Sequence, residues 1–180
     1  MKSKSQGFTL LELVVVIVIL GILAVTAAPR FLGVQRDAHE ALAQGAFAAF
    51  RNSIDMYHSQ WLVDGEPNFD QVVNYGQGDI YPSSSGFPFA VGDAPVSAGV
   101  GLSGDDCVEL WNALMTTDLT IRAHGSSVFP SEENIVGWYT ADPSCYYYYT
   151  SGFSFGEDIP RLNYFPLTGE VTITADSPSS

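Results

Sequence analysis

The sequence predicts an α+β protein in which a long N-terminal α-helix packs against a C-terminal antiparallel sheet of about four strands. Three observations support this fold class: an almost wholly apolar run near the N-terminus, apolar side chains at helical spacing after it, and β-branched or aromatic runs separated by turns in the last third. We therefore expect a short leader at 1–7, an apolar helix at 8–29, its amphipathic continuation at 30–61 and a globular α+β head at 62–180.

The apolar run is long enough to cross a membrane. Residues 8–28 would extend about 31 Å as a helix, which matches a hydrocarbon core of about 30 Å. Lys2 and Lys4 precede the run, so the positive-inside rule keeps the N-terminus in the cytoplasm and sends the head outward. An ordinary secretory signal is disfavoured, because Glu12 lies inside the run and Pro29 would stand at the cut. A plain anchor with Glu12 snorkelling to the interface is the alternative.

The helix is expected to continue beyond Pro29 to about residue 61, because apolar side chains keep spacings of three and four. Charged side chains fill other positions, so this half should be amphipathic and pack on the head. The expected apolar stripe comprises Phe31, Val34, Ala38, Leu42, Phe47, Phe50, Ile54, Tyr57 and Trp61.

The head begins with a segment full of turn formers, residues 62–104, in which we expect one short helix near 69–73 and little else regular. A second helix follows in "SGDDCVELWNALM", with Ser103 or Asp105 as its N-cap and Cys107 on its apolar stripe.

The last third predicts the sheet. We expect strands in "NIVGWYTA", "CYYYYTS", "RLNYF" and "EVTITA", with a hairpin loop at 166–169 between the last two. In the run Tyr146–Tyr149 alternate rings should point to opposite faces. One pair should enter the core, and the other should be exposed for subunit packing or for stacking on sugars.

Cys107 and Cys145 are the only cysteines, too few for a four-ligand zinc site. In an exported chain they most simply form one disulfide, which would stabilise the fold by about 4 kcal/mol in the chain-entropy model. Two reduced core cysteines are the alternative.

Charge and motifs exclude several functions. The formal net charge is −13, whereas nucleic-acid binding needs clustered basic side chains, so no nucleic-acid partner is expected. His39, His58 and His124 are scattered, and no nucleophile elbow or phosphate-binding loop is present in the sequence, so no enzyme is predicted. No cofactor is expected either. A calcium site is the one alternative that we leave open, because four carboxylates stand near glycines, although they lack the spacing of an EF-hand. They are Asp105, Asp106, Glu157 and Asp158.

The stretch "QGFTLLELVVVIVILGILAVTAAPRF" resembles the class III signal of type IV prepilins and pseudopilins. The resemblance implies the pilin fold, cleavage after Gly7 by a prepilin peptidase, and N-methylation of the new terminus at Phe8. It also implies subunit assembly through Phe8, Glu12, Gly21 and Pro29. The expected partners are other pilin subunits in a filament, the peptidase and an inner-membrane assembly platform, and the expected location is the bacterial inner membrane and then an extracellular pilus.

Cleavage would give Glu12 a partner, because it creates an amine cation at Phe8 on the same apolar surface. The pair could form within one subunit or between neighbours, and the family resemblance implies the neighbour. Losing one partner of a buried ion pair costs about 3–5 kcal/mol, so the contact would select register as well as supply energy.

More narrowly, "ELVVVIVILGILAVTAAPRF", "DDCVELWNALM" and the closing "LNYFPLTGEVT" resemble pilins of the mannose-sensitive haemagglutinin (MSHA) group. This resemblance implies a subunit, a minor pilin, of a pilus that serves surface attachment, adhesion or motility. The alternatives are a type II secretion pseudopilin and a glycan-binding tip adhesin.

Overall fold

The structure is a computed structural model that describes residues 8–97, 102–140 and 143–178, apart from the side chains of Ala28, Pro29 and Leu32. The chain divides into two compact units, Met1–Ala38 and His39–Ser180. The long helix α1, Leu10–Val63, belongs to both units, so each part of it is described with its own unit.

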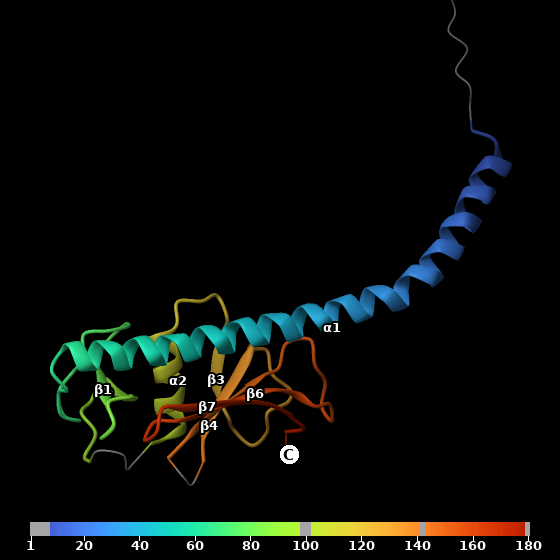
Figure 1. Ribbon diagram of the computed structural model, residues 1–180. Coiled ribbons are helices and arrows are strands. Elements are labelled where there is room, and N and C mark those ends of the chain that lie inside the picture. Colours follow the sequence, from blue (N-terminus) through green and yellow to red (C-terminus); the bar gives the residue numbers. More distant parts are fainter. Residues whose placement is uncertain (1–7, 98–101, 141–142, 179–180) are drawn as a thin grey trace, which may run out of the picture. The chain divides into compact units, whose positions relative to one another are not determined.

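In the first unit, α1 (Figure 1) is almost wholly apolar from Leu13 to Ala27, and charged side chains follow at Arg30, Arg36 and Asp37. The described side chains of this part are exposed, except that of Arg36, which is partly buried. The helical assignment continues across position 29, so Pro29 does not end the helix. Val63 ends it two residues beyond the predicted boundary at 61, which is within the usual uncertainty of helix ends.

In the second unit, α1 buries one stripe of side chains that face the sheet and α2. Its members recur at spacings of four and three residues and are fully buried: Ala43, Phe47, Phe50, Ile54 and Tyr57. Four side chains that we had placed on this stripe are exposed, which corrects the prediction: Phe31 (70%), Val34 (66%), Ala38 and Leu42 (56%). The predicted stripe is thus buried only in its second half, from Phe47 on. Successive helical residues differ by about 100°, so Ala43 occupies the core-facing position and turns its neighbour outward.

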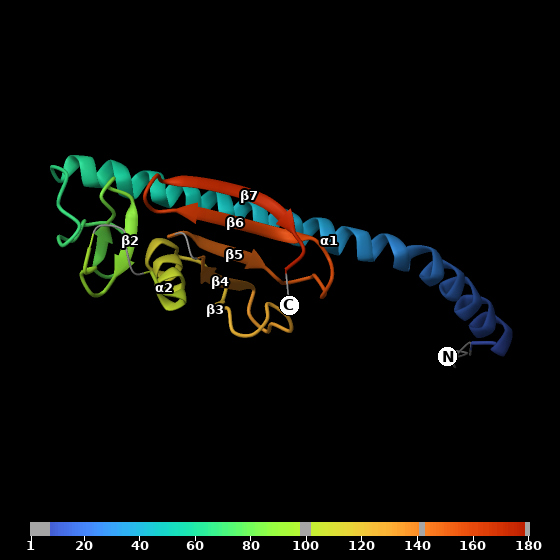
Figure 2. The same ribbon diagram turned by 90° about the horizontal axis from the view of Figure 1, so that it is seen from below.

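The main sheet has five strands in the order β3-β4-β5-β6-β7, seen side by side in Figure 2. Their bounds are Ile121–Ala123, Ile135–Tyr139, Cys145–Tyr149, Ile159–Phe165 and Glu170–Asp176. The last four are the predicted strands and pair antiparallel. β3 was not predicted, and it pairs parallel to β4, so the sheet is mixed. The predicted α+β pilin fold is thus confirmed, with one additional strand at the edge opposite β7.

The segment between α1 and α2 holds a two-stranded antiparallel sheet, β1 Ile80–Pro82 with β2 Pro88–Val91. The helix expected near 69–73 is absent from this described stretch. The Val73 amide instead donates to the Ile80 carbonyl at 3.0 Å, which is strand-like pairing. The Tyr57 hydroxyl also donates to the Ile80 carbonyl, at 3.1 Å, and so joins this small sheet to α1.

Helix α2, Gly104–Leu114, begins at the predicted N-cap Ser103. The Ser103 amide donates to the Asp106 carboxylate at 2.5 Å, and the Asp106 amide donates to the Ser103 hydroxyl at 3.3 Å. This capping box satisfies amide groups that the first turn cannot pair. The buried face of α2 comprises Gly104, Cys107, Leu110, Trp111, Ala113 and Leu114.

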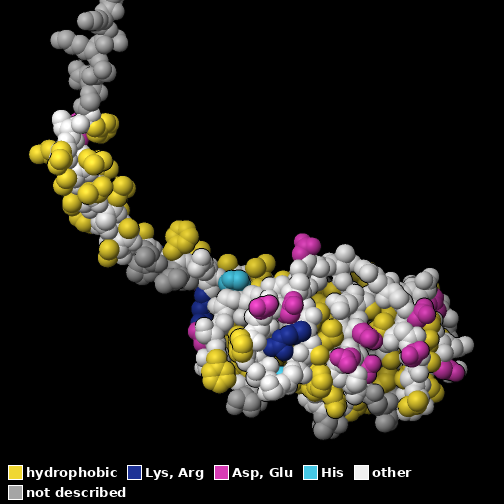
Figure 3. All heavy atoms as spheres, turned by 180° about the vertical axis from the view of Figure 1, so that it is seen from behind, with side chains coloured by type: hydrophobic (Ala, Val, Ile, Leu, Met, Phe, Trp, Pro, Cys, Tyr) yellow, Lys and Arg dark blue, Asp and Glu magenta, His cyan; other side chains and the backbone are white. Residues whose placement is uncertain are grey.

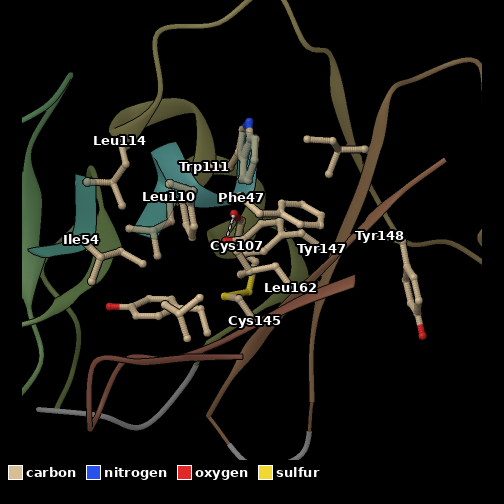
Figure 4. Close-up of a cluster of buried hydrophobic side chains, with 14 of the residues drawn as sticks. Phe47, Ile54, Cys107, Leu110, Trp111, Leu114, Cys145, Tyr147, Tyr148 and Leu162 are labelled. Atoms are coloured by element: carbon tan, nitrogen blue, oxygen red, sulfur yellow. Dashed lines mark hydrogen bonds between the residues drawn. A yellow bond between two sulfur atoms is a disulfide. The ribbon is translucent and has the colours of Figure 1, made fainter. Parts of the chain in front are cut away.

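The core of the second unit combines aliphatic side chains with a cluster of aromatic rings (Figure 4). Phe50 of α1 stacks on Trp111 of α2 at 4.8 Å between ring centroids and meets Tyr147 of β5 edge-on at 5.1 Å. It also contacts Tyr164 of β6 at 6.1 Å. One side chain therefore joins both helices to the middle of the sheet.

Candidate functional site

The N-terminal part of α1 is a surface without a partner inside the chain. Leu10–Ala27 is long and apolar enough to cross a membrane, and none of it is buried. Phe8, just before the helix, is 84% exposed. Figure 3 shows hydrophobic side chains along the visible side of this segment, whereas acidic side chains are spread over the visible face of the head. A bare apolar helix of this length needs lipid or other protein to cover it.

Glu12 forms a capping box with Thr9 at the start of α1. The carboxylate oxygen Oε2 accepts from the Thr9 amide at 2.9 Å and from the Thr9 hydroxyl at 2.8 Å, while the Glu12 amide donates to Thr9 Oγ1 at 3.2 Å. Our sequence interpretation gave Glu12 a pairing role and missed this one. The Thr-x-x-Glu spacing before an apolar run would have indicated it.

From Leu13 to Ala27 the helix has a single polar side chain, that of Thr26. The Thr26 hydroxyl donates to the Leu23 carbonyl at 2.9 Å, so it needs no partner outside the helix. A Cβ added at Gly21 would meet nothing within 4 Å, so no contact inside the chain requires a glycine there. Of the other predicted assembly residues, Pro29 has a described backbone only, and Gly7, the predicted cleavage site, lies outside the described residues.

In the head, Cys107 of α2 and Cys145 of β5 form the predicted disulfide, with their Cα atoms 5.6 Å apart. Both cysteines are fully buried. The bond fixes the helix to the sheet beside the aromatic core (Figure 4).

The tyrosine run of β5 alternates as predicted, because Tyr147 and Tyr149 are buried in the core and Tyr146 and Tyr148 lie on the opposite face. The second pair is not an open platform, which corrects our expectation: Tyr148 is only 7% exposed and Tyr146 is partly buried. The Arg161 guanidinium lies over both rings, 5.9 Å from the centroid of Tyr146 and 5.6 Å from that of Tyr148. Burial raises the pKa of Tyr146 to about 12, so its hydroxyl stays protonated.

The three histidines have separate partners. His39 Nδ1 lies 3.2 Å from the Tyr149 hydroxyl, His58 Nδ1 lies 3.1 Å from the Gly86 carbonyl oxygen, and His124 Nδ1 contacts the Tyr146 hydroxyl. None of these contacts joins a histidine to a serine, cysteine or carboxylate.

The carboxylates considered for calcium have local roles. Asp106 is part of the α2 capping box, and Glu157 accepts from the Ser154 amide at 2.7 Å. Within the described residues, no group of three or more His, Cys, Asp or Glu side chains could hold a metal ion.

Comparison with known proteins adds a family motif and several relatives. Residues 2–28 match the family described as "Prokaryotic N-terminal methylation motif". The chain is 34% identical over 102 residues to the type IV narrow pilus major component PilA5 of Thermus thermophilus, a match that covers 57% of this chain and 84% of that protein.

Two further relatives are secretion proteins. The chain is 46% identical over 75 residues to the type II secretion system core protein G of Aeromonas hydrophila, covering 41% of this chain and 52% of that protein. It is 44% identical over 55 residues to the protein of the same name from Escherichia coli, covering 31% of this chain and 38% of that protein. These matches thus span about half or less of the secretion proteins. No solved structure matches the chain.

Proposed function

Because this chain belongs to the type IV pilin family, we propose that it is a minor pilin of an MSHA-type pilus that serves surface attachment, adhesion or motility. At the coarser level it is a pilin-like structural subunit of a type IV pilus or of a type II secretion pseudopilus. The observation that carries the proposal is the exposed apolar helix with a single carboxylate near its start.

The proposed sequence of events begins in the inner membrane. The subunit inserts through 8–29 with its N-terminus in the cytoplasm, a prepilin peptidase cuts after Gly7, and the new terminus is methylated at Phe8. An assembly platform then moves the helix from lipid into a filament of pilin subunits, with the head outward. No enzymatic activity is expected, because the role is mechanical.

In this scheme Glu12 gains a second partner during assembly. In the uncut chain the Phe8 nitrogen belongs to a peptide bond and carries no charge. After cleavage it is a cation close to a carboxylate whose two bonds from Thr9 both go to Oε2. No described contact occupies Oε1, so this oxygen can accept from the amine of a neighbouring subunit while the capping box stays intact. Charge-assisted hydrogen bonds of this kind are about twice as strong as neutral ones.

Three substitutions separate capping from charge pairing. Glu12→Gln keeps a side-chain oxygen for the cap but removes the charge, Thr9→Val removes the capping hydroxyl but keeps the charge, and Glu12→Ala removes both. We expect all three precursors to insert and to be cut after Gly7. Incorporation should fall at least about tenfold for both Glu12 variants, because an unpaired buried amine costs several kcal/mol. The measurement is the ratio of subunit in sheared filaments to subunit in membranes.

Thr9→Val is the matched control, and it should retain most of the incorporation, since losing a helix cap costs only about 1 kcal/mol. If Thr9→Val assembled as poorly as Glu12→Gln, the role of Glu12 would be capping and the proposed pair would be wrong. Substituting Gly7 should instead leave uncut precursor in the membrane.

The secretion pseudopilus is the second candidate, favoured by the similarity to the two core protein G relatives. Deleting the gene should reduce surface pili and adhesion if the proposal is right, while protein secretion into the medium stays unchanged. Loss of secretion with normal piliation would assign the subunit to the secretion system.

A further inference from the structure

A groove lies on the second unit, between α1 and the segment that joins α2 to β3. Its volume is about 440 Å³, within the range of about 300–1,000 Å³ that is typical of binding pockets. Small residues of α1 form one wall, and the joining segment contributes two apolar side chains and one carboxylate: Ala41, Gly45, Ala49, Met115, Leu119 and Asp118. Among the described residues that line the groove, Asp118 is the only charged one. The groove therefore suits an apolar partner that carries one cation.

The α1 wall of the groove is accessible to another helix. Ala41, Gly45 and Ala49 are exposed, and so is Leu42 beside them. A Cβ added at Gly45 would meet nothing within 4 Å, so no contact inside the chain requires a glycine there. Residues four apart share one face of a helix, and the distance between two packed helices depends on the side chains at their contact. Because these side chains are small, a helix from another molecule can approach α1 closely here.

A short segment of α1 needs a cover that lipid does not supply. Phe31 and Val34 are exposed, and they share one side of the helix because they are three residues apart. Val34 lies about 10 Å along the helix beyond Ala27, where the membrane-length span ends. The headgroup layer on each side of the hydrocarbon core is only about 5–7 Å thick. Protein must therefore cover Val34 if this apolar surface is to be removed from water.

Charge complementarity points to that segment as the occupant of the groove. Arg30 and Arg36 are two of the five arginines in the chain, and no carboxylate lies between them, whereas residues 39–180 are strongly acidic. Two heads therefore repel each other, while a head attracts a basic segment. Within the described residues, neither the Arg30 nor the Asp118 side chain has a hydrogen bond or an ion pair. Arg30 lies one turn before Val34 on the same side of the helix, so it is the cation available to Asp118.

We propose that residues 30–34 of α1 dock into this groove on a second copy of the chain, with Phe31 and Val34 against the small residues and Arg30 paired with Asp118. The inference rests on the proposed role as a filament subunit and adds a specific contact to it. The contact joins two different patches, and repeated contacts of this heterologous kind build an open helical filament.

The contact requires an offset between the two copies. The centre of the groove, at Gly45, lies about 13 residues beyond the centre of the 30–34 segment, which corresponds to about 20 Å of helix. Copies that span one bilayer lie at the same depth, because the same apolar span fixes each of them, so they cannot make this contact. It forms only after one copy has moved out of the membrane. The proposed pair between Glu12 and the Phe8 amine needs an offset of only about four residues, so it involves a different neighbour.

The test is disulfide crosslinking of the full chain in cells, with Val34→Cys and Gly45→Cys in the same chain. The two natural cysteines are bonded to each other and fully buried, so they do not react. The space around Gly45 accommodates the new side chain. After treatment with a mild oxidant, we expect sheared filaments to give dimers and higher multimers of the subunit and the membrane fraction to stay monomeric. Each single-cysteine variant should stay monomeric in both fractions.

Val34→Cys combined with Gln44→Cys is the matched control. Gln44 precedes Gly45 on α1 but lines a different hollow, beside β7. Because successive helical residues differ by about 100°, its side chain points away from the groove. This pair of cysteines should give few crosslinks in the same filaments.

Charge reversal tests the contact without introduced cysteines. Arg30→Asp and Asp118→Arg should each lower the ratio of subunit in filaments to subunit in membranes several-fold, because each places like charges opposite one another. The double variant Arg30→Asp/Asp118→Arg should recover most of the loss. Asp93→Arg is the control, because Asp93 is exposed and does not line the groove. It should assemble like the wild type.

The contact is wrong if filaments that contain the Val34→Cys/Gly45→Cys subunit give no multimers, if the Gln44→Cys control crosslinks equally well, or if the double charge reversal restores nothing. Absence of the wild-type subunit from filaments would contradict the proposed function and this contact with it. Presence of the subunit in filaments without these crosslinks would contradict the contact alone, so the two failures can be told apart.

Discussion

Glu12 has two partners that become available at different times. Thr9 is within hydrogen-bonding distance in the uncut chain, whereas a cationic amine at Phe8 exists only after cleavage. The cap explains how a carboxylate is tolerated at the start of an apolar helix before assembly, since it satisfies the charge locally. The sequence pattern led us to the second partner only, because we read the carboxylate as a charge in need of a counterion and overlooked the threonine three residues before it.

His124 predicts a pH dependence of the head. Its ring faces the Tyr146 hydroxyl and the ring of Trp138. Arg122 lies two residues before it on β3, and Arg161 of β6 lines a small pocket together with His124. Burial, with the Arg122 charge, lowers its pKa below the ordinary value of 6.5. The unfolded chain therefore binds this proton at a higher pH than the folded chain does, so the free energy of unfolding should fall as pH drops below about 6.5.

The variant His124→Gln isolates this effect. Carboxylates titrate in the same acid range, so the quantity to measure is the difference between wild type and variant in the free energy of unfolding at about pH 7 and at about pH 5. We expect the wild type to lose more stability than the variant on acidification. Equal losses would show that His124 does not titrate differently in the folded and unfolded chains.

At the level of elements, the long helix and the longer strands were predicted correctly, whereas the short strands were missed and the predicted stripe of α1 is buried only from Phe47 on. The buried stripe of α1 from Phe47 to Tyr57, the Ser103 cap of α2 and strands β4 to β7 follow from local pattern, and the strand ends differ from the prediction by at most two residues. β3 and the β1–β2 pair are three or four residues long, so they carry too little alternation to recognise. The parallel pairing of β3 with β4 depends on contacts distant in sequence.

The same limit applies to the candidate sites. The alternation along β5 predicts which tyrosines point away from the core. It does not predict that Arg161 of β6 lies over them, because this contact depends on the register between the two strands. The spacing of the two cysteines likewise allowed a disulfide without proving it. Their position on the buried sides of α2 and β5 makes the bond possible.

Gly21 gives a prediction for the apolar helix. A helical glycine is about 1 kcal/mol less favourable than alanine, and nothing inside the chain approaches it. We expect its value to lie in close approach by a neighbouring helix, as small residues allow in membranes. Gly21→Ala should therefore insert and assemble nearly normally, whereas Gly21→Leu should insert normally but enter filaments several-fold less well.

Ala27→Leu is the control for Gly21→Leu, because it places the same leucine side chain on a different side of the same helix. Incorporation is measured as the fraction of subunit in sheared filaments. Equal losses for the two leucine variants would mean that bulk anywhere on the helix is harmful and that Gly21 has no special position.

At the scale of the whole head, stability depends on one aromatic core and one covalent bond. Phe50 joins both helices to the sheet, and the disulfide joins α2 to β5 beside it. The bond closes a loop of 38 residues, which corresponds to about 4 kcal/mol in the chain-entropy model. For a head of this size, that is a large part of the free energy of unfolding.

The double variant Cys107→Ala/Cys145→Ala should lower the free energy of unfolding by about 2–5 kcal/mol. Near-ultraviolet circular dichroism of the full chain in detergent is a suitable measurement, because every Trp and Tyr lies in residues 39–180. Reductant provides the control: it should lower the melting temperature of the wild type and leave that of the double variant unchanged. A wild type insensitive to reductant while it unfolds would contradict the prediction.

The Thr26 hydroxyl returns its hydrogen bond to its own helix, and every other side chain from Leu13 to Ala27 is apolar or glycine. Such a helix offers no hydrogen-bonding side chain to a neighbouring helix along this stretch. If one helix slid along the other by one turn, about 5.4 Å, the energy of most of their contacts would therefore change little. Glu12 is the exception. Its carboxylate is the only charged side chain between Phe8 and Ala27. It is therefore the group that could fix the register of two such helices.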